Sequence, residues 1–167
     1  MYPKIGTQIS FSNDETLSDA ILNANESVEN YNIHNYQAYL GAKNSCNVRK
    51  LTPEDIKISN NLIGDRGFFI HSSLINYLTN REAFRRYCKR RLVNELRHAK
   101  HFKNSGVVSH PGSRNSRGER LELNEALDNV VHSVVDIYKD APGDLGLLYL
   151  ENSAGEGSKI FRNLDEI

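Results

Sequence analysis

The sequence predicts an α/β protein of the (β/α)8 TIM-barrel type, here an incomplete barrel of about five β/α units. Five short apolar segments alternate with helical patterns along the chain. Strict alternation is typical of parallel strands joined by right-handed crossovers. Five units and a fraction fit either a complete doubly wound sheet or the first part of a barrel. The last helical pattern, 163–167, has barely begun where the sequence stops, which favours the barrel.

The five predicted strands are apolar segments that are too short for helices and are bounded by Gly, Ser or Asn. They are Ile5–Ser10, Tyr36–Leu40, Phe68–His71, Val107–His110 and Leu147–Glu151. In a barrel of this type the functional residues lie at the C-terminal ends of the strands. The strand ends are therefore the places to search for chemistry.

Two helices are predicted from their start signals. Thr16 is an N-cap candidate for a helix that begins in the segment up to Leu22. In the second helix Thr52 is the N-cap candidate, Pro53 takes the first helical position and Asp55 stands at the capping-box position.

Two longer helices are predicted from apolar residues that recur every three or four positions. Over Arg81–Phe102 the apolar stripe consists of Phe84, Cys88, Leu92, Leu96 and Ala99. Over Leu121–Tyr138 it consists of Leu123, Leu127, Val130, Val131, Val134, Val135 and Tyr138.

The third predicted helix is strongly basic in a chain of zero net charge. Residues 81–103 contain nine Lys or Arg against Glu82 and Glu95. A solvated helix face explains most of this charge, and a phosphate-contacting surface is the alternative. Only the N-terminal end of the helix follows the third strand toward the mouth of the barrel. Arg81, Arg85 and Arg86 are therefore the residues placed to reach phosphates.

Composition narrows the class of protein. The 167 residues, 38% hydrophobic and 25% charged, are ordinary for one globular domain. The sequence contains no apolar run of about 18 residues, so we expect no membrane span. The start of the chain shows no signal-peptide pattern. Cys46 and Cys88 match no metal or redox spacing, so we expect an intracellular protein of a reducing compartment, cytoplasm or nucleus.

Three consecutive predicted strands end in potential metal ligands. His71 ends the third strand, His110 the fourth and Glu151 the fifth. Each residue alone is more often a hydrogen-bonded edge or surface residue. Their joint occurrence on adjacent strand ends indicates a site for zinc, or for manganese or iron. Three protein ligands leave coordination positions open, as in catalytic sites, where a metal can lower the pKa of water to about 7.

Longer motifs around these residues resemble the endonuclease IV family of apurinic/apyrimidinic endonucleases. The motifs are IGTQIS, YQAYLG, HSSLIN, GVVSHPGS and LENSAGEGS, in the order and approximate spacing of the family. The resemblance spans nearly all of this chain but only the N-terminal part of the family's fold. It implies a TIM barrel with three zinc ions in its mouth. It also implies a base-excision-repair hydrolase that cleaves double-stranded DNA on the 5′ side of abasic sites.

The resemblance also assigns roles to the three strand-end residues. His71 and His110 match ligands of one zinc, and Glu151 matches the catalytic carboxylate that bridges this zinc to a second. The family's other ligands come from later strands. We therefore expect residues 1–167 to be a single domain that is a fragment of such a barrel, a half completed by a second polypeptide, or a degenerate relative.

DNA contacts are expected from three loops at the mouth. The resemblance places Leu74, Ile75 and Asn76 at the minor groove, where apolar wedges can unstack a base step. Lys43, Asn44 and Arg49, after the second strand, are candidates for backbone contacts. Gly112 and Ser113 follow His110 and let the backbone approach a phosphate.

The sequence departs from the family's pattern at two places. Gln8 stands where the family has histidine, and HSSLIN lacks the family's aromatic residue before LIN.

Two other functions remain open. A sugar isomerase or epimerase of the same barrel type also places acids and histidines around a divalent metal. A catalytically incomplete remnant that binds DNA or a partner is the other alternative. A half-barrel leaves two open sheet edges, so we also expect self-association.

Overall fold

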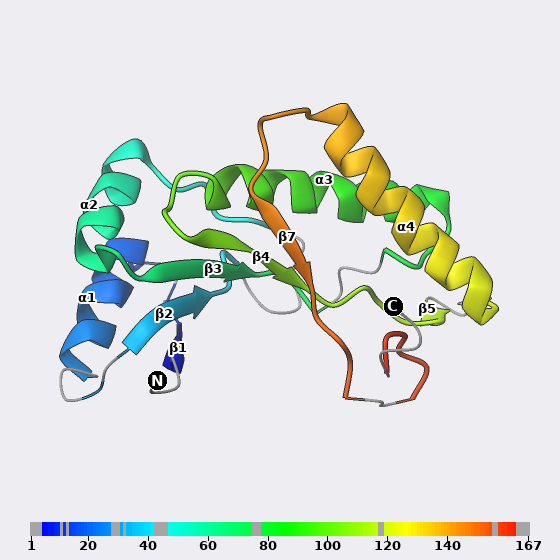
Figure 1. Ribbon diagram of the computed structural model, residues 1–167, viewed down its shortest axis with the longest axis horizontal. Coiled ribbons are helices and arrows are strands. Elements are labelled where there is room, and N and C mark those ends of the chain that lie inside the picture. The colour runs from blue at the N-terminus through cyan, green and yellow to red at the C-terminus, as the bar shows by residue number, and fades with distance from the viewer. Residues whose placement is uncertain are drawn as a thin grey trace.

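Five parallel strands form one sheet in the order β1-β2-β3-β4-β7 (Figure 1). The computed structural model describes residues 5–10, 12, 14–27, 31, 33–41, 47–74, 78–116, 119–154 and 157–162. The strands are β1 (Ile5–Ile9), β2 (Ile33–Ala38), β3 (Gly67–His71), β4 (Ser105–Ser109) and β7 (Leu147–Leu150). All four strand pairings are parallel. The predicted α/β partial barrel is confirmed.

Among the described residues, four helices connect these strands. They are α1 (Leu17–Ser27), α2 (Pro53–Ile63), α3 (Glu82–Ala99) and α4 (Leu123–Asp140). A short antiparallel hairpin, β5 (Asn115–Ser116) with β6 (Glu119–Arg120), lies between β4 and α4 and was not predicted. None of the described helices is long and apolar enough to cross a membrane. The predicted tail helix, 163–167, lies outside the described residues.

Strand β2 begins earlier and ends earlier than predicted, at Ile33 and Ala38 rather than Tyr36 and Leu40. The polar residues Asn35 and Gln37 pair with β3 as part of the strand. They alternate with Tyr36 and Ala38, which are fully buried. The prediction missed Ile33, His34 and Asn35, because the polar residues His34 and Asn35 interrupt the apolar pattern at the start of the strand.

The N-termini of α1 and α2 are capped by side chains from both helices. Thr16 and Asp19 form a reciprocal capping box, in which each backbone N–H donates to the other's side chain at 3.1 Å. Thr52 caps α2 as predicted, because its hydroxyl accepts from the N–H of Asp55 at 3.1 Å. The Asp55 carboxylate instead accepts from the N–H groups of Leu17 and Ser18, at 3.2 and 2.9 Å. Asp55 therefore caps α1, not its own helix.

Helix α3 buries most of its predicted stripe. Cys88, Leu92, Leu96 and Ala99 are buried, and Phe84 is half-buried against them. Arg91 and Glu95 are also buried, and they form an ion pair at 2.8 Å. Several of the remaining basic residues pair with acids, such as Lys89 with Asp136 of α4 at 2.8 Å. Much of the basic charge of α3 is thus compensated within the fold.

The buried face of α4 lies one position away from the predicted stripe. The buried residues are Ala126, Val130, Ser133 and Ile137. Val131 and Val135, which the spacing placed inside, are 60% and 42% exposed. The prediction followed large apolar residues only. The residues at the centre of the buried face include the small Ala126 and the polar Ser133, which this pattern leaves out.

The described helices pack on one face of the sheet, and the other face is open. Residues that alternate with the core line a hollow of about 470 Å³ on the open face. They include Gln8, Asn35, Gln37, Phe69 and Tyr149. The ring of Phe69 contacts that of Tyr149 edge-on, with centroids 5.7 Å apart. This face corresponds to the interior of a barrel.

Candidate metal centre

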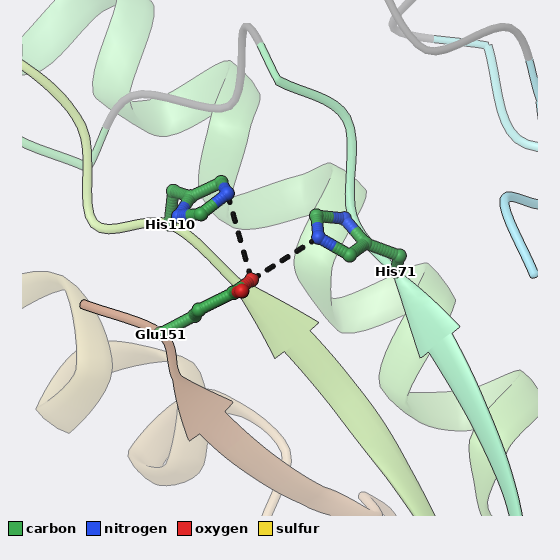
Figure 2. Close-up of side chains that lie close together, drawn as sticks. All are labelled: His71, His110 and Glu151. Carbon is green, nitrogen blue, oxygen red and sulfur yellow. Dashed lines mark hydrogen bonds and ion pairs between the residues drawn. The ribbon is translucent and has the colours of Figure 1, made fainter. Parts of the chain in front are cut away.

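Three adjacent strands deliver His71, His110 and Glu151 to one place (Figure 2). His71 is the last residue of β3, and the other two directly follow β4 and β7. Backbone pairing continues past the strand ends, because Glu151 N–H donates to Ser109 O at 3.0 Å. The sheet itself therefore fixes where the three side chains start.

The side chains converge on one carboxylate oxygen. His71 Nε2 and His110 Nε2 lie 3.2 and 3.5 Å from Glu151 Oε2. One potential ligand atom of each residue lies within 4.8 Å of the other two. Two ligands that are each about 2.0–2.1 Å from a tetrahedral zinc lie about 3.4 Å apart. The two nitrogen–oxygen separations match this value, so the donor set fits a small divalent cation.

The surroundings of His71 define which ring nitrogen is available. His71 is buried, and its Nδ1 lies 2.7 Å from the carbonyl oxygen of Ser72. A carbonyl oxygen only accepts, so Nδ1 carries the proton and Nε2 presents a lone pair in the neutral ring. That lone pair faces the Glu151 carboxylate. A metal cation bound between them would make this contact attractive.

His110 and Glu151 form the open side of the cluster. The side chains of His110 and Glu151 are 23% and 44% exposed, against 8% for His71. Three protein ligands with one exposed side are the arrangement of catalytic metal sites, which keep a position for water or substrate. The predicted ligand set is thus brought together in a geometry suited to reaction with a bound molecule.

Several solved structures share this arrangement of strands and helices. Endonuclease IV from Thermus thermophilus has 21% identity and a TM-score of 0.75, covering 98% of this chain and 57% of that chain. A D-tagatose 3-epimerase-like protein has 18% identity and a TM-score of 0.64, covering 93% and 55%.

D-Psicose 3-epimerase from Clostridium cellulolyticum has 11% identity and a TM-score of 0.58, covering 96% of this chain and 55% of that chain. These similarities show the fold, a partial TIM-barrel-like arrangement of strands and helices. This chain spans little more than half the length of these neighbours. No protein-family model and no curated protein matches the sequence.

Tyr39 lies beside the candidate site and was missed by the sequence reasoning. Its ring packs against that of His71, with centroids 4.7 Å apart. Burial raises the pKa of the Tyr39 hydroxyl, the negative charge of Glu151 raises it further, and a hydrogen bond with Gln8 opposes both. Tyr39 directly follows β2, as His110 follows β4. The strand-end rule that pointed to the candidate ligands could therefore also have found Tyr39.

Glu95 is the second residue that was missed, because it belongs to the basic helix α3. It is fully buried, and it is linked both to Arg91 and to the hydroxyl of Ser72, the residue after His71. Burial raises the pKa of Glu95, whereas the charge of Arg91 and the Ser72 hydrogen bond lower it. Glu95 stands next to Leu96 of the apolar stripe, and this position was the sequence feature that could have indicated its burial.

The residues predicted at DNA lie in different settings. Leu74 follows β3 and is 38% exposed. The Arg49 side chain donates to the carbonyl oxygens of Ser12, at 2.7 Å, and Glu15. The other candidates of these two loops, Ile75, Asn76, Lys43 and Asn44, lie outside the described residues.

Ser113 is buried at the junction of two mouth loops. Its hydroxyl lies 2.7 Å from that of Ser158, and its carbonyl oxygen accepts from Thr79 at 2.7 Å. These bonds join the loop after β4 to the loops after β3 and β7. A role of Ser113 at DNA stays a prediction, and its contacts indicate that it also shapes the mouth.

Proposed function

We propose that this chain belongs to a metal-dependent phosphodiesterase that cleaves the DNA backbone on the 5′ side of abasic sites. The observation that carries the proposal is the convergence of His71, His110 and Glu151 at the mouth of the sheet. The motifs around these residues resemble those of endonuclease IV. A solved endonuclease IV is also similar in fold. The proposal joins these three lines of support.

The proposed cofactor is zinc, with manganese or iron as alternatives. His71 and His110 would provide neutral imidazole nitrogens and Glu151 a carboxylate oxygen, a donor set suited to these ions. Bound there, such an ion supplies Lewis acidity and lowers the pKa of water to about 7. The Ser72 carbonyl holds the His71 ring in the tautomer that a metal requires.

The exposed carboxylate of Glu151 is the catalytic residue of the proposal. Its side chain is 44% exposed, so substrate can approach it from the solvent side. We propose that Leu74, Ile75 and Asn76 approach the minor groove, and that Lys43, Asn44, Arg49 and Ser113 contact the DNA backbone. Binding through phosphates would make affinity depend steeply on salt concentration.

The proposal concerns a barrel larger than this chain. The chain covers 57% of the similar endonuclease IV. We propose that residues 1–167 form the N-terminal portion of such a barrel. Further ligands of a three-zinc cluster would then come from additional strands, in the same polypeptide or in another.

Nicking of a DNA duplex that carries one abasic site tests the proposal directly. We expect zinc-dependent cleavage on the 5′ side of the site, abolished by chelator and by His110→Ala. His132→Ala, which removes an exposed imidazole from α4, is the matched control and should cleave as the wild type does. Chelator-resistant cleavage, or cleavage by His110→Ala as fast as by the wild type, would contradict the proposal.

A sugar epimerase is the second candidate, because two of the similar structures are an epimerase and an epimerase-like protein. Incubation with ketohexoses and a divalent metal separates the two functions. Metal-dependent formation of the C3 epimer without nicking would favour the epimerase. The motifs SHPGS and ENSAGEGS, which resemble those of endonuclease IV, favour the phosphodiesterase.

A further inference from the structure

Glu95 and Arg91 form a buried ion pair that packing alone does not require. Glu95 is fully buried and Arg91 is 5% exposed. Glu95 Oε1 lies 2.9 Å from Arg91 Nε and 2.8 Å from Arg91 Nη2. Removing two charges from water is costly, and apolar residues of similar volume are often as stable in such places. A pair of this kind therefore calls for an explanation beyond stability.

The pair leads to the candidate metal centre through one residue. The Ser72 hydroxyl hydrogen bonds to the Glu95 carboxylate. Ser72 N–H donates to Val108 O of β4 at 2.8 Å, and Ser72 O accepts from His71 Nδ1 at 2.7 Å. Ser72 is thus held by α3 on one side and by β4 on the other. Its carbonyl in turn fixes the ring of His71.

We propose that Glu95 is a positioning residue that holds Ser72 and, through it, aims His71 Nε2 at the metal. Arg91 keeps the Glu95 carboxylate in place. The inference rests on the proposed metal site, and it adds a connection from the outer helix to that site. Groups that orient a metal-bound histidine by accepting its other N–H typically change metal affinity 10- to 100-fold when they are removed.

The test measures zinc affinity by calorimetric titration of the purified, folded chain. Ser72→Ala removes the hydroxyl that reaches Glu95 and leaves the backbone carbonyl. Arg91→Met with Glu95→Leu replaces the whole ion pair by apolar side chains, so that no buried charge is left alone. Ser59→Ala, which removes a buried hydroxyl from α2, is the matched control.

We expect Ser72→Ala and the Arg91→Met/Glu95→Leu variant each to weaken zinc binding by less than the 10- to 100-fold that follows loss of the accepting group itself, about 3- to 10-fold, because both variants keep the Ser72 carbonyl. A variant that carries all three substitutions should bind zinc only slightly more weakly than either of these variants. Both variants interrupt the same chain of contacts from Arg91 through Glu95 and Ser72 to His71. Nitrogen-15 spectra of the metal-free chain should show His71 protonated at Nδ1 in the wild type and as mixed tautomers in the variants. A purely structural role of the pair would leave this tautomer unchanged.

Wild-type zinc affinity in a folded Arg91→Met/Glu95→Leu variant would overturn the inference and leave the metal site intact. If that variant does not fold, unchanged zinc affinity in Ser72→Ala overturns it equally. Absence of zinc binding by the wild type would instead overturn the proposed metal site, and this inference with it. The two failures are therefore distinguishable.

Discussion

Asp55 is a residue whose main contact lies far away in sequence. Its carboxylate accepts from the first two N–H groups of α1, which are 38 and 37 positions away. The first N–H groups of a helix have no partner within the helix, and an acid there also interacts favourably with the helix dipole. Asp55 therefore joins α1 to α2 on the outside of the sheet.

Replacing Asp55 by alanine should destabilise the protein by about 1–2 kcal/mol, the usual cost of losing a helix N-cap. The loss should appear as a lower midpoint in urea with an unchanged slope. Glu54→Ala removes a neighbouring acid that is exposed in the same helical turn, and it is the control. Equal destabilisation by both substitutions would show that the α1 cap is not the cause.

At the scale of elements, the C-terminal end of α3 carries a pH-sensitive residue. Burial lowers the pKa of His98 below its usual value of 6.5, and the nearby charges of His101 and Lys50 lower it further. The folded state therefore disfavours protonated His98. Between the lowered folded pKa and about 6.5 the unfolded chain binds more protons, so stability rises with pH in this window.

Accordingly, the wild type should lose stability as the pH falls below about 6.5. In His98→Gln the free energy of unfolding should change less steeply with pH. The difference in slope should correspond to a fraction of one bound proton. Urea unfolding at pH 5, 6 and 7 measures the difference, with His132→Gln on α4 as the comparison. If the free energy of unfolding changes equally with pH in the wild type and in His98→Gln, then His98 is not the cause of the pH dependence.

The sequence predicted the elements better than their contacts. The strand order and the helices α3 and α4 follow from apolar periodicity, which depends on local spacing. The start of β2 was missed because the polar residues His34 and Asn35 interrupt the apolar pattern there. The burial of Glu95 was missed because its partners, Ser72 among them, come together only in the folded chain.

The candidate site shows the same division between local and long-range information. His71, His110 and Glu151 were predictable because parallel strands must bring their C-terminal ends to one edge. Tyr39 escaped because an aromatic residue beside a strand end also fits an ordinary core. The hydrogen bond that sets the His71 tautomer involves a backbone carbonyl, which no side-chain pattern reveals.

At the scale of the whole molecule, the sheet has two edge strands. Among the described residues, β1 and β7 each pair with a single neighbour. Leu147, Tyr149 and Leu150 of β7 are 61%, 43% and 37% exposed. An apolar edge with unpaired backbone groups is a template for pairing with another chain. The expected self-association remains a prediction, and these residues are its most direct structural support.

Sedimentation velocity of the 167-residue chain tests this expectation. We expect concentration-dependent association that Leu147→Lys reduces, because a charged side chain on an edge strand opposes pairing. Leu22→Lys places the same charge at an exposed leucine of α1 and should have no such effect. A wild type that sediments as a single monomer at all concentrations would refute edge pairing.

The separation of the three ligands along the chain has a thermodynamic consequence. His71 and Glu151 are 80 positions apart, so their ligand atoms meet only when β3, β4 and β7 have paired. A cation that binds this cluster binds the native state and not the unfolded chain. At a concentration about 100 times its Kd it would add about 2.7 kcal/mol to the free energy of unfolding. Metal binding at this site would thus also be a measure of how completely the sheet has assembled.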